Sequence, residues 1–333
     1  MKAIRLDGVG APEQLRLVNL PVPEIGDHEA LIKVEYAGLL YADTEQRRGT
    51  YYLPTSLPWF PGREVAGVVA RVGRDVEHLV PGMRVVALVF SGGGYAEYVR
   101  APTHVYTLPG GTSVPACEVL TLPDTVSFSQ ALVYVVNFRL AHVLVHGYAK
   151  VPPGASVLVH GASGGFVSCV TQIARDNRNL VIALCRSEAE VAFCRQIGAD
   201  HQIDITTNDY VTAVLDLTAG RGVDFSFNGV GGPTLDRDPL AVCTFGEIHA
   251  YGYVAGKSSF NPFSVPKSVS LKTFAADDFL TTRSFRDATE TMYEWFRSRP
   301  LLDVTKVFDL GDAALAHHWI ESGRAIGKIA LRP

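Results

Sequence analysis

The chain has 333 residues, of which 47% are hydrophobic and 19% charged. This apolar share is enough for a sizeable core and excludes wholesale disorder. With 30 Lys and Arg against 34 Asp and Glu, the net charge is −4, so the chain lacks the basic excess with which proteins hold nucleic acid or an anionic membrane. At roughly 150 residues per domain, the length predicts about two domains.

The N-terminal segment MKAIRLDGVGAPEQ carries charges throughout and has no apolar core, so we expect no signal peptide. The most apolar stretch, 129–147, contains Asn137, Arg139, His142 and His146, and it is predicted as a buried helix rather than a membrane span. The five cysteines are odd in number and include no C-x-x-C pair. Free thiols in a reducing cytoplasm are therefore predicted.

Before residue 122, short alternating runs lie between Pro-Gly and Gly-Gly turn signals. These runs cover residues 30–34, 65–72 and 84–90. Short strands at such spacing predict a β-barrel or a β-sandwich.

After residue 122 the pattern changes to strands that alternate with helices. Strands are predicted at 156–160, 180–184, 201–205, 223–228, 247–253 and 270–276, with helices at 166–177 and 187–197. A capping box of Ser187 and Glu190 starts the second helix, and Gly198 ends it. Alternating β and α units predict a parallel, doubly wound sheet. The tail after about 280 is predicted to hold a long helix, a strand at 305–310, a helix from 312 and a last strand at 328–331.

The motif V-L-V-H-G-A-S-G-G-F-V at 157–167 is a predicted strand, a glycine turn and the start of a helix. In a dinucleotide fold, glycines let the backbone approach the pyrophosphate, and the helix N-terminus supplies free N–H groups. The flanking strand and helix provide the context that this motif requires. We therefore predict a dinucleotide site here.

The same letters spell G-x-S-x-G at 161–165, the nucleophile elbow of serine hydrolases. In that alternative, Ser163 is the nucleophile, Asp224 the acid and His249 the base. An elbow is usually preceded by several α/β strands, whereas the first 120 residues here have an all-β pattern. The hydrolase stays as the less favoured hypothesis.

About 20 residues beyond the turn, the second strand ends at Arg186 and Ser187. An NAD site usually places an acidic residue there for the ribose 2′-hydroxyl, whereas an Arg accommodates the 2′-phosphate of NADP. Arg186 and Ser187 therefore favour NADPH. In the alternative interpretation, Arg186 is a solvated charge and Ser187 only a helix cap.

With these motifs in place, the sequence resembles the medium-chain dehydrogenase/reductases, in their zinc-independent quinone oxidoreductase (zeta-crystallin-like) branch. Similar stretches extend over nearly the whole chain, at 1–4, 37–49, 61–69, 80–86, 94–98, 157–165, 198–200, 222–224, 229–232 and 327–329. The resemblance implies an α/β protein with a GroES-like β-barrel catalytic domain at 1–122 and 277–333 and a Rossmann domain at 123–276. It also implies a cleft for nicotinamide and substrate, and a homodimer.

Zinc members of this family place Cys where this chain has Leu40 and His where it has Arg63, and neither Leu nor Arg ligates a metal. The pair His142 and His146 lacks a third ligand in the sequence, so no metal site is predicted. By resemblance, Tyr41 and Tyr51 line the substrate pocket as donors or aromatic walls, and Arg63 contributes electrostatically. Asp43 is expected to be structural.

Several positions depart from the usual pattern of the quinone reductases. These are Leu40, Leu140, Phe166, Val167, Glu190, Ile205 and Asn228. Val167 stands where a glycine serves close packing of helix against strand. Together the departures indicate a reshaped cofactor site or a pocket adapted to an unusual apolar substrate.

The sequence thus predicts a zinc-independent, NADPH-dependent reductase of a quinone or an α,β-unsaturated carbonyl. The predicted cofactor-binding residues are Gly161, Ala162, Ser163, Gly164, Gly165, Phe166, Val167, Arg186, Ser187, Asn228, Gly229, Gly252 and Tyr253. Two alternatives stay open: a diverged member with non-redox cyclase or lyase chemistry, and a binding or structural role.

Overall fold

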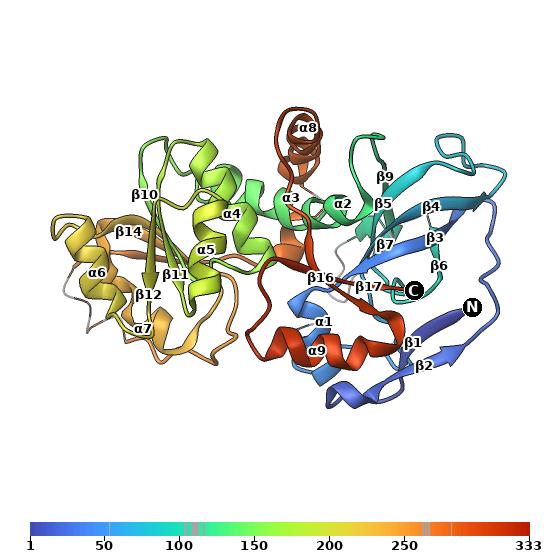
Figure 1. Cartoon of the computed structure of the whole chain (residues 1–333), viewed down its shortest axis with the longest axis horizontal. Helices are drawn as coiled ribbons and strands as arrows, with labels where there is room; N and C mark the ends of the chain where they lie inside the picture. Colours follow the sequence, from blue (N-terminus) through green and yellow to red (C-terminus); the bar gives the residue numbers. More distant parts are fainter. Residues whose placement is uncertain are drawn as a thin grey trace. The chain divides into compact units, whose positions relative to one another are not determined.

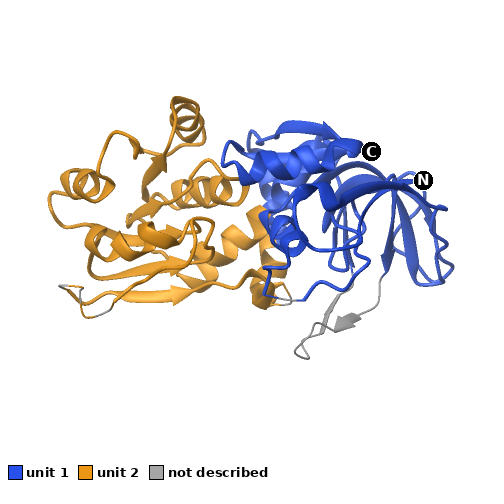
Figure 2. Cartoon of the chain, turned by 90° about the horizontal axis from the view of Figure 1, so that it is seen from below, with its two compact units in different colours: residues 1–136, 289–333 blue, residues 137–288 orange. Residues whose placement is uncertain are grey.

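The computed structural model describes residues 1–52, 54–102, 105–107, 113–115, 117–261, 263, 265, 267–280 and 282–333. Contacts divide the chain into unit 1, residues 1–136 and 289–333, and unit 2, residues 137–288 (Figure 2). Both boundaries fall later in the chain than the predicted ones at 122 and 276. The first difference arises because helix α2 (Phe128–Tyr134) contacts strands of unit 1; the second boundary falls within helix α8 (Arg283–Ser298).

Unit 1 is built around a seven-stranded sheet in the order β16-β17-β3-β4-β5-β9, with β6 also paired to β3 (Figure 1). All pairs are antiparallel except β16–β17. Two separate hairpins are β1–β2 and β7–β8. The strands are β1 (Lys2–Leu6), β2 (Leu15–Asn19), β3 (Glu29–Gly38), β4 (Glu64–Val72), β5 (Arg84–Val89), β6 (Tyr98–Pro102), β7 (Val105–Thr107), β8 (Ser113–Pro115), β9 (Cys117–Thr121), β16 (Val304–Asp309) and β17 (Lys328–Arg332).

Strand β3 illustrates why this sheet forms. Ala30, Ile32 and Val34 point to one face and are buried in the core of unit 1, whereas Lys33 between the last two is exposed. The C-terminal strand β17 pairs with β3 through Ala330 and Gly38, so the tail completes the sheet of the N-terminal segment. The other helical segments of unit 1 are η1 (Pro12–Gln14), α1 (Tyr41–Arg48), η5 (Leu310–Asp312) and α9 (Ala313–Glu321).

Unit 2 contains a six-stranded parallel sheet in the order β12-β11-β10-β13-β14-β15. This is the 3-2-1-4-5-6 order of a dinucleotide-binding fold, and it confirms the doubly wound prediction. The strands are β10 (Ser156–Val159), β11 (Leu180–Cys185), β12 (His201–Asp204), β13 (Val223–Asn228), β14 (Val242–Ala250) and β15 (Ser270–Thr273). The helices are α3 (Asn137–His142), η2 (Val143–Tyr148), α4 (Gly165–Asp176), α5 (Glu188–Gln196), α6 (Tyr210–Leu217), α7 (Gly232–Ala241) and η4 (Ala276–Phe279).

The order of this sheet positions the candidate cofactor site. Strand β10 lies between β11 and β13, which is where the order of the strands reverses. Val159 pairs with Phe227, and Asn228 pairs with Ala250, so β10, β13 and β14 end at one edge. Ligands of open α/β sheets bind outside this edge, at the reversal point.

One helical segment, Phe128–Tyr148, is long and apolar enough to span a bilayer by length and composition alone. Within its most apolar window, 78% is buried inside the protein, and a buried core helix passes the same test. The predicted helix at 129–147 corresponds to α2, α3 and the π-helical turn η2.

Candidate functional site

The glycine turn between β10 and α4 has the geometry of an anion site. Gly161 has a φ of 61°, in the left-handed region that glycine adopts without strain. Gly164 is the N-cap of α4, and no side chain caps the helix there. The N–H groups of the first turn are thus available to a phosphate, and the helix dipole favours its negative charge.

The alternative triad of a serine hydrolase is not assembled. Ser163 is only 2% exposed, whereas an elbow presents its serine to the substrate. The carboxylate of Asp224 accepts hydrogen bonds from Ser156 and Arg221, and His249 lies 2.9 Å from Glu247. The proposed acid and base therefore serve other partners, and this interpretation of the motif is wrong.

Two further loops pack against each other at the same sheet edge. A Cβ atom on Gly252 would lie 2.4 Å from the carbonyl oxygen of Gly229, and one on Gly229 would lie 2.4 Å from the ring of Tyr251. Such contacts require glycine at both positions. Tyr253 follows with 45% exposure.

Phe166 and Tyr251 form an aromatic pair beside the glycine turn. Their ring centroids are 5.1 Å apart in an edge-to-face arrangement. The Tyr251 hydroxyl is buried without a hydrogen-bond partner among the described residues, and burial raises its pKa. Val167 is 8% exposed, so the first turn of α4 buries the larger side chain that replaces the usual glycine.

Asn228 stabilises the loop that follows β13. It is fully buried, and its Oδ1 accepts hydrogen bonds of 2.9 Å from the N–H groups of Val230 and Gly231. Its Nδ2 donates to Asp238, which also accepts from Ser226 and Tyr210 and lies 2.7 Å from His160. The buried Asp238 carboxylate therefore contacts both His160, the residue before the glycine turn, and Asn228, which shapes the loop that contains Gly229.

Arg186 and Ser187 lie at the end of β11, but their partners differ from the predicted capping box. Ser187 Oγ accepts the N–H of Glu190, as expected. The Glu190 carboxylate, however, accepts the N–H of Arg186 at 2.7 Å instead of that of Ser187. It also binds the Arg186 guanidinium at 2.9 Å. The Arg186 side chain is half exposed, so the cation of the proposed 2′-phosphate site is held by a neighbouring carboxylate.

In unit 1, the structure brings Tyr51 and Arg63 together. Arg63 donates to the Tyr51 hydroxyl at 3.4 Å, and its guanidinium lies 5.2 Å from the centroid of the Tyr51 ring. Tyr41, at the start of α1, instead accepts a hydrogen bond from Arg48. Of the three predicted catalytic residues, two thus form a pair and the third has a different partner.

Buried polar groups lie next to these residues in the sequence. Asp43 is fully buried and accepts hydrogen bonds from the Leu40 N–H and the Tyr95 hydroxyl, which fits the structural role expected for it. Burial raises the pKa of Asp43, although the nearby Arg63 opposes that change. The Tyr95 hydroxyl also lies 3.5 Å from His317, whose pKa burial lowers to about 3.

Glu64, the residue after Arg63, forms a buried ion pair with Lys328 of the tail. Lys328 also donates to the Leu39 carbonyl at 2.9 Å, so this pair connects the C-terminal strand to the segment before α1. Burial lowers the pKa of Lys328 to about 7. The charge of nearby Asp43 acts in the opposite direction and raises this pKa.

Among the described residues, no group of three or more His, Cys, Asp or Glu side chains is arranged to hold a metal ion. His142 and His146 have ring centroids 4.8 Å apart. Burial lowers the pKa of His142 to about 4, and the neighbouring His146 acts in the same direction.

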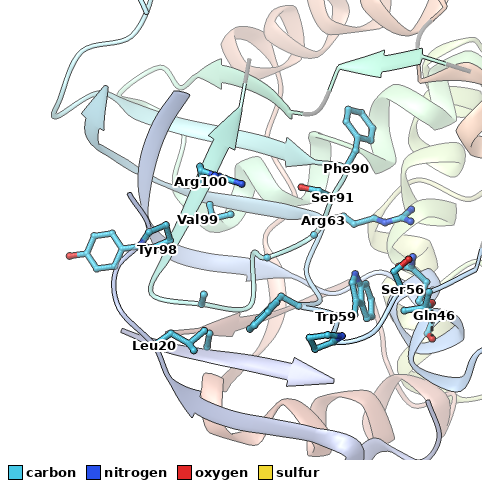
Figure 3. Close-up of a pocket in the computed structure, with 18 of the residues that line it drawn as sticks. Leu20, Gln46, Ser56, Trp59, Arg63, Phe90, Ser91, Tyr98, Val99 and Arg100 are labelled. Atoms are coloured by element: carbon cyan, nitrogen blue, oxygen red, sulfur yellow. Dashed lines mark hydrogen bonds between the residues drawn. The ribbon is translucent and has the colours of Figure 1, made fainter. Parts of the chain in front are cut away.

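A cavity of about 660 Å³ opens in unit 1 beside Arg63 (Figure 3). Its walls come from the ends of the β1–β2 hairpin, residues 54–60, the turn at 90–93 and strand β6. Cavities of this size are typical of small-molecule sites.

Sequence reasoning found the glycine turn but missed the residues that support it. Asp238 and Tyr251 have no motif around them, and only the fold brings them to the sheet edge. His160, the residue after β10, is 2% exposed.

Two family models match the chain. Residues 26–110 match the "Alcohol dehydrogenase GroES-like domain" and residues 197–331 match "Zinc-binding dehydrogenase". The first match covers much of the sheet of unit 1, and the second extends from unit 2 into the C-terminal tail.

Full-length relatives are similar over nearly the whole chain. A quinone oxidoreductase of Lama guanicoe is 31% identical, covering 99% of this chain and 97% of that protein. A probable quinone oxidoreductase of Schizosaccharomyces pombe is 30% identical, covering 98% and 96%.

Solved structures of similar proteins point to the same family. A quinone oxidoreductase of Pseudomonas syringae is 27% identical with a TM-score of 0.87, covering 100% of this chain and 99% of that one. A mycobacterial protein in complex with NADPH is 29% identical with a TM-score of 0.86, covering 100% of both chains. The chain therefore belongs to the quinone oxidoreductase family of the medium-chain dehydrogenase/reductase superfamily.

Proposed function

We propose that this protein is a zinc-independent, NADPH-dependent reductase of a quinone or an α,β-unsaturated carbonyl. The observation that carries the proposal is the glycine turn at the sheet edge where the strand order reverses. Its helix N-terminus has no side-chain cap, which suits a pyrophosphate. The relative that was solved with NADPH supports this cofactor.

NADPH would be held by residues of unit 2. The turn of Gly161–Val167 takes the pyrophosphate, and Arg186 with Ser187 takes the 2′-phosphate. The loops that contain Gly229 and Gly252–Tyr253 bound the same sheet edge, and Asn228 fixes the shape of the first of these loops. When bound, NADPH supplies a hydride to the substrate. The protein contributes mainly binding and orientation.

The Arg63–Tyr51 pair supplies the polarising groups. The cationic guanidinium and the phenolic O–H stabilise negative charge that develops on the substrate oxygen. The proton that completes the reduction comes from water or from Tyr51. One hydride and one proton together convert a quinone to a hydroquinone, or an enone to its saturated ketone.

The name of the second matching family includes zinc, and the residues here do not fit that metal. Leu40 has no donor atom, and the Arg63 guanidinium stays protonated. Arg63 thus supplies a positive charge without a metal, and the proposed reduction does not involve zinc.

We also propose a homodimer that works in the cytoplasm. Strand β15 is the last strand of its sheet, and Leu271 on it is 42% exposed, which suits pairing with a second copy. The five cysteines are buried thiols rather than disulfides, which suits a reducing compartment. Light scattering of the purified protein measures the dimer directly, and a monomeric mass contradicts it.

The test is a titration of the protein with NADPH and with NADH, followed by cofactor fluorescence. We expect tighter binding of NADPH and its oxidation when 1,4-benzoquinone or 2-cyclohexenone is added. Absence of binding at millimolar NADPH overturns the proposal. Binding without oxidation of NADPH by either compound favours the non-redox or binding role instead.

A further inference from the structure

The cavity of unit 1 continues well beyond the pair that is proposed to act on the substrate. Arg63 and Phe90 lie toward one end of it, while Leu20 and Arg100 lie toward the other (Figure 3). All of the lining residues belong to unit 1. The cavity therefore offers space away from Arg63 that the proposed reduction does not use.

The walls of this extension are more apolar than polar, although Ser91 and Arg100 also line the cavity. Trp59, Phe60 and Phe90 contribute aromatic faces, and Leu20 and Val99 contribute aliphatic ones. Trp59 and Phe90 are each 9% exposed, so their remaining accessible surface is small. Apolar atoms that enter such a space leave water, and this transfer is favourable.

The walls are also held in place before any ligand binds. Trp59 and Leu6 exchange backbone hydrogen bonds of 2.9 and 2.8 Å, and the Gly93 N–H donates to the Phe60 carbonyl at 2.8 Å. A Cβ atom on Gly92 would lie 2.4 Å from the Phe60 carbonyl oxygen, so the 90–93 turn packs directly on the 59–60 segment. A preformed cavity binds without the cost of ordering its walls.

We propose that this cavity binds the apolar side chain of the substrate, so that the preferred substrates are quinones or enones with a long alkyl or isoprenoid chain. The inference rests on the proposed function, because the Arg63 end is taken to hold the reacting carbonyl. The volume of about 660 Å³ lies well inside the range of ligand sites. It exceeds what a single quinone ring fills.

Charge and apolar surface together orient the substrate. Arg63 is cationic and donates to the Tyr51 hydroxyl, so this end suits an electron-rich oxygen. At the other end Arg100 lies 3.7 Å from the Glu29 carboxylate, and the aromatic and aliphatic walls of the cavity suit a chain without charges. A molecule with one polar head and one apolar tail fits both parts.

The location is tested with a photoaffinity probe, a 1,4-benzoquinone whose decyl chain carries a terminal diazirine. We expect mass spectrometry of the labelled protein to find the modification on residues of the cavity, such as Leu20 or Val99. Excess 2-decyl-1,4-benzoquinone reduces this labelling, and the same concentration of 2-methyl-1,4-benzoquinone reduces it much less. Labelling spread over the surface, or unaffected by the competitor, overturns the proposal. Absence of labelling in the cavity, as expected if a segment of the protein occupies it, overturns the proposal as well.

The effect on specificity is tested with a matched pair of variants. Leu20→Trp fills the far end of the cavity, whereas Val22→Trp adds the same side chain two residues away, at a position that does not line it. In the wild type we expect the decyl quinone to have a KM at least about tenfold below that of the methyl quinone, because each buried CH₂ adds to binding. We expect Leu20→Trp to bring the ratio of the two KM values close to one and Val22→Trp to leave this ratio unchanged.

If Leu20→Trp does not fold, Leu20→Asp provides the second test, because a charge at this position opposes an apolar chain. Equal KM values for both quinones in the wild type contradict the inference while leaving the proposed reduction intact. Specific labelling of the cavity without any NADPH oxidation supports the binding site for the apolar chain and contradicts the proposed reduction.

Discussion

Units 1 and 2 each carry a proposed site, and the two sites are built differently. In unit 2 the proposed cofactor site consists mainly of backbone atoms of glycine turns, which are supported by the buried carboxylate of Asp238 and its hydrogen-bond donors. In unit 1 the groups proposed to act on the substrate are side chains, Tyr51 and Arg63, beside a cavity. A backbone site keeps its shape when exposed side chains change, whereas a side-chain site changes with each substitution. This difference predicts that unit 2 preserves cofactor binding while unit 1 sets the substrate.

The largest effect is expected from Asp238→Ala in unit 2. The substitution leaves buried donors on Ser226, Asn228 and Tyr210 without their acceptor, and we expect a loss of about 3 kcal/mol in the free energy of unfolding. Urea denaturation measures this loss. Asp236→Ala on the same helix is the control, because that carboxylate accepts hydrogen bonds from the hydroxyls of Ser258 and Ser259 nearer the surface. Equal losses in both variants contradict the role given to the buried carboxylate.

The second substitution, Arg63→Ala, acts on the side-chain site of unit 1. We expect kcat/KM to fall about hundredfold, as when one stabilising donor is removed from an active site, while the Kd of NADPH stays unchanged. Arg48→Ala, beside Tyr41, is the matched control. Stopped-flow oxidation of NADPH measures the rate, and a parallel loss of NADPH affinity would show that the two units do not divide the work in this way.

A pH dependence follows from His317 in unit 1. Its pKa is about 3 in the folded protein, below the usual value of about 6.5 for the unfolded chain. The unfolded state therefore binds more protons between these values, so the stabilising contribution is complete above pH 6.5 and declines as the pH falls toward 3. The loss amounts to at most about 1.4 kcal/mol per pH unit. Thermal unfolding of the wild type and His317→Gln between pH 7 and 5 should show a smaller decline in the variant, and parallel curves would refute this.

The smallest effect concerns selectivity between the two nicotinamide cofactors. Because Glu190 already pairs with the Arg186 guanidinium, Arg186→Ala should weaken NADPH binding only about tenfold, with little change for NADH. Glu190→Gln removes the carboxylate charge beside the guanidinium and should raise the preference for NADPH. Fluorescence titrations give both dissociation constants. Equal losses for the two cofactors in Arg186→Ala would remove Arg186 from the 2′-phosphate site.

The same contrast explains what the sequence could predict. The parallel sheet and the Gly161–Val167 turn follow from local patterns, since a strand, a glycine turn and a helix are adjacent in the chain. The support of that turn by Asp238 depends on residues brought together by strand pairing. The pairing of Tyr51 with Arg63 and the Glu64–Lys328 ion pair likewise join separate segments. The resemblance to a family named Tyr51 and Arg63 as site residues but did not predict that they pair.

Prediction from local sequence patterns also failed where two hydrogen-bond donors compete for one carboxylate. The capping box was predicted from Ser187 and Glu190, but the Glu190 carboxylate accepts the Arg186 N–H and guanidinium instead. A charged guanidinium one residue earlier is a stronger partner than a neutral N–H alone. The less favoured serine-hydrolase alternative failed for a related reason, because Asp224 and His249 bind nearer partners.

Hydride transfer by this protein is tested most directly with NADPH that carries deuterium at the nicotinamide C4 position and with a long-chain 2-enone as substrate. Mass spectrometry of the product then locates the label. We expect one deuterium at the β-carbon, from only one of the two C4 stereoisomers of the labelled cofactor. A product without deuterium, or no product while NADPH is bound, would contradict the proposed reduction.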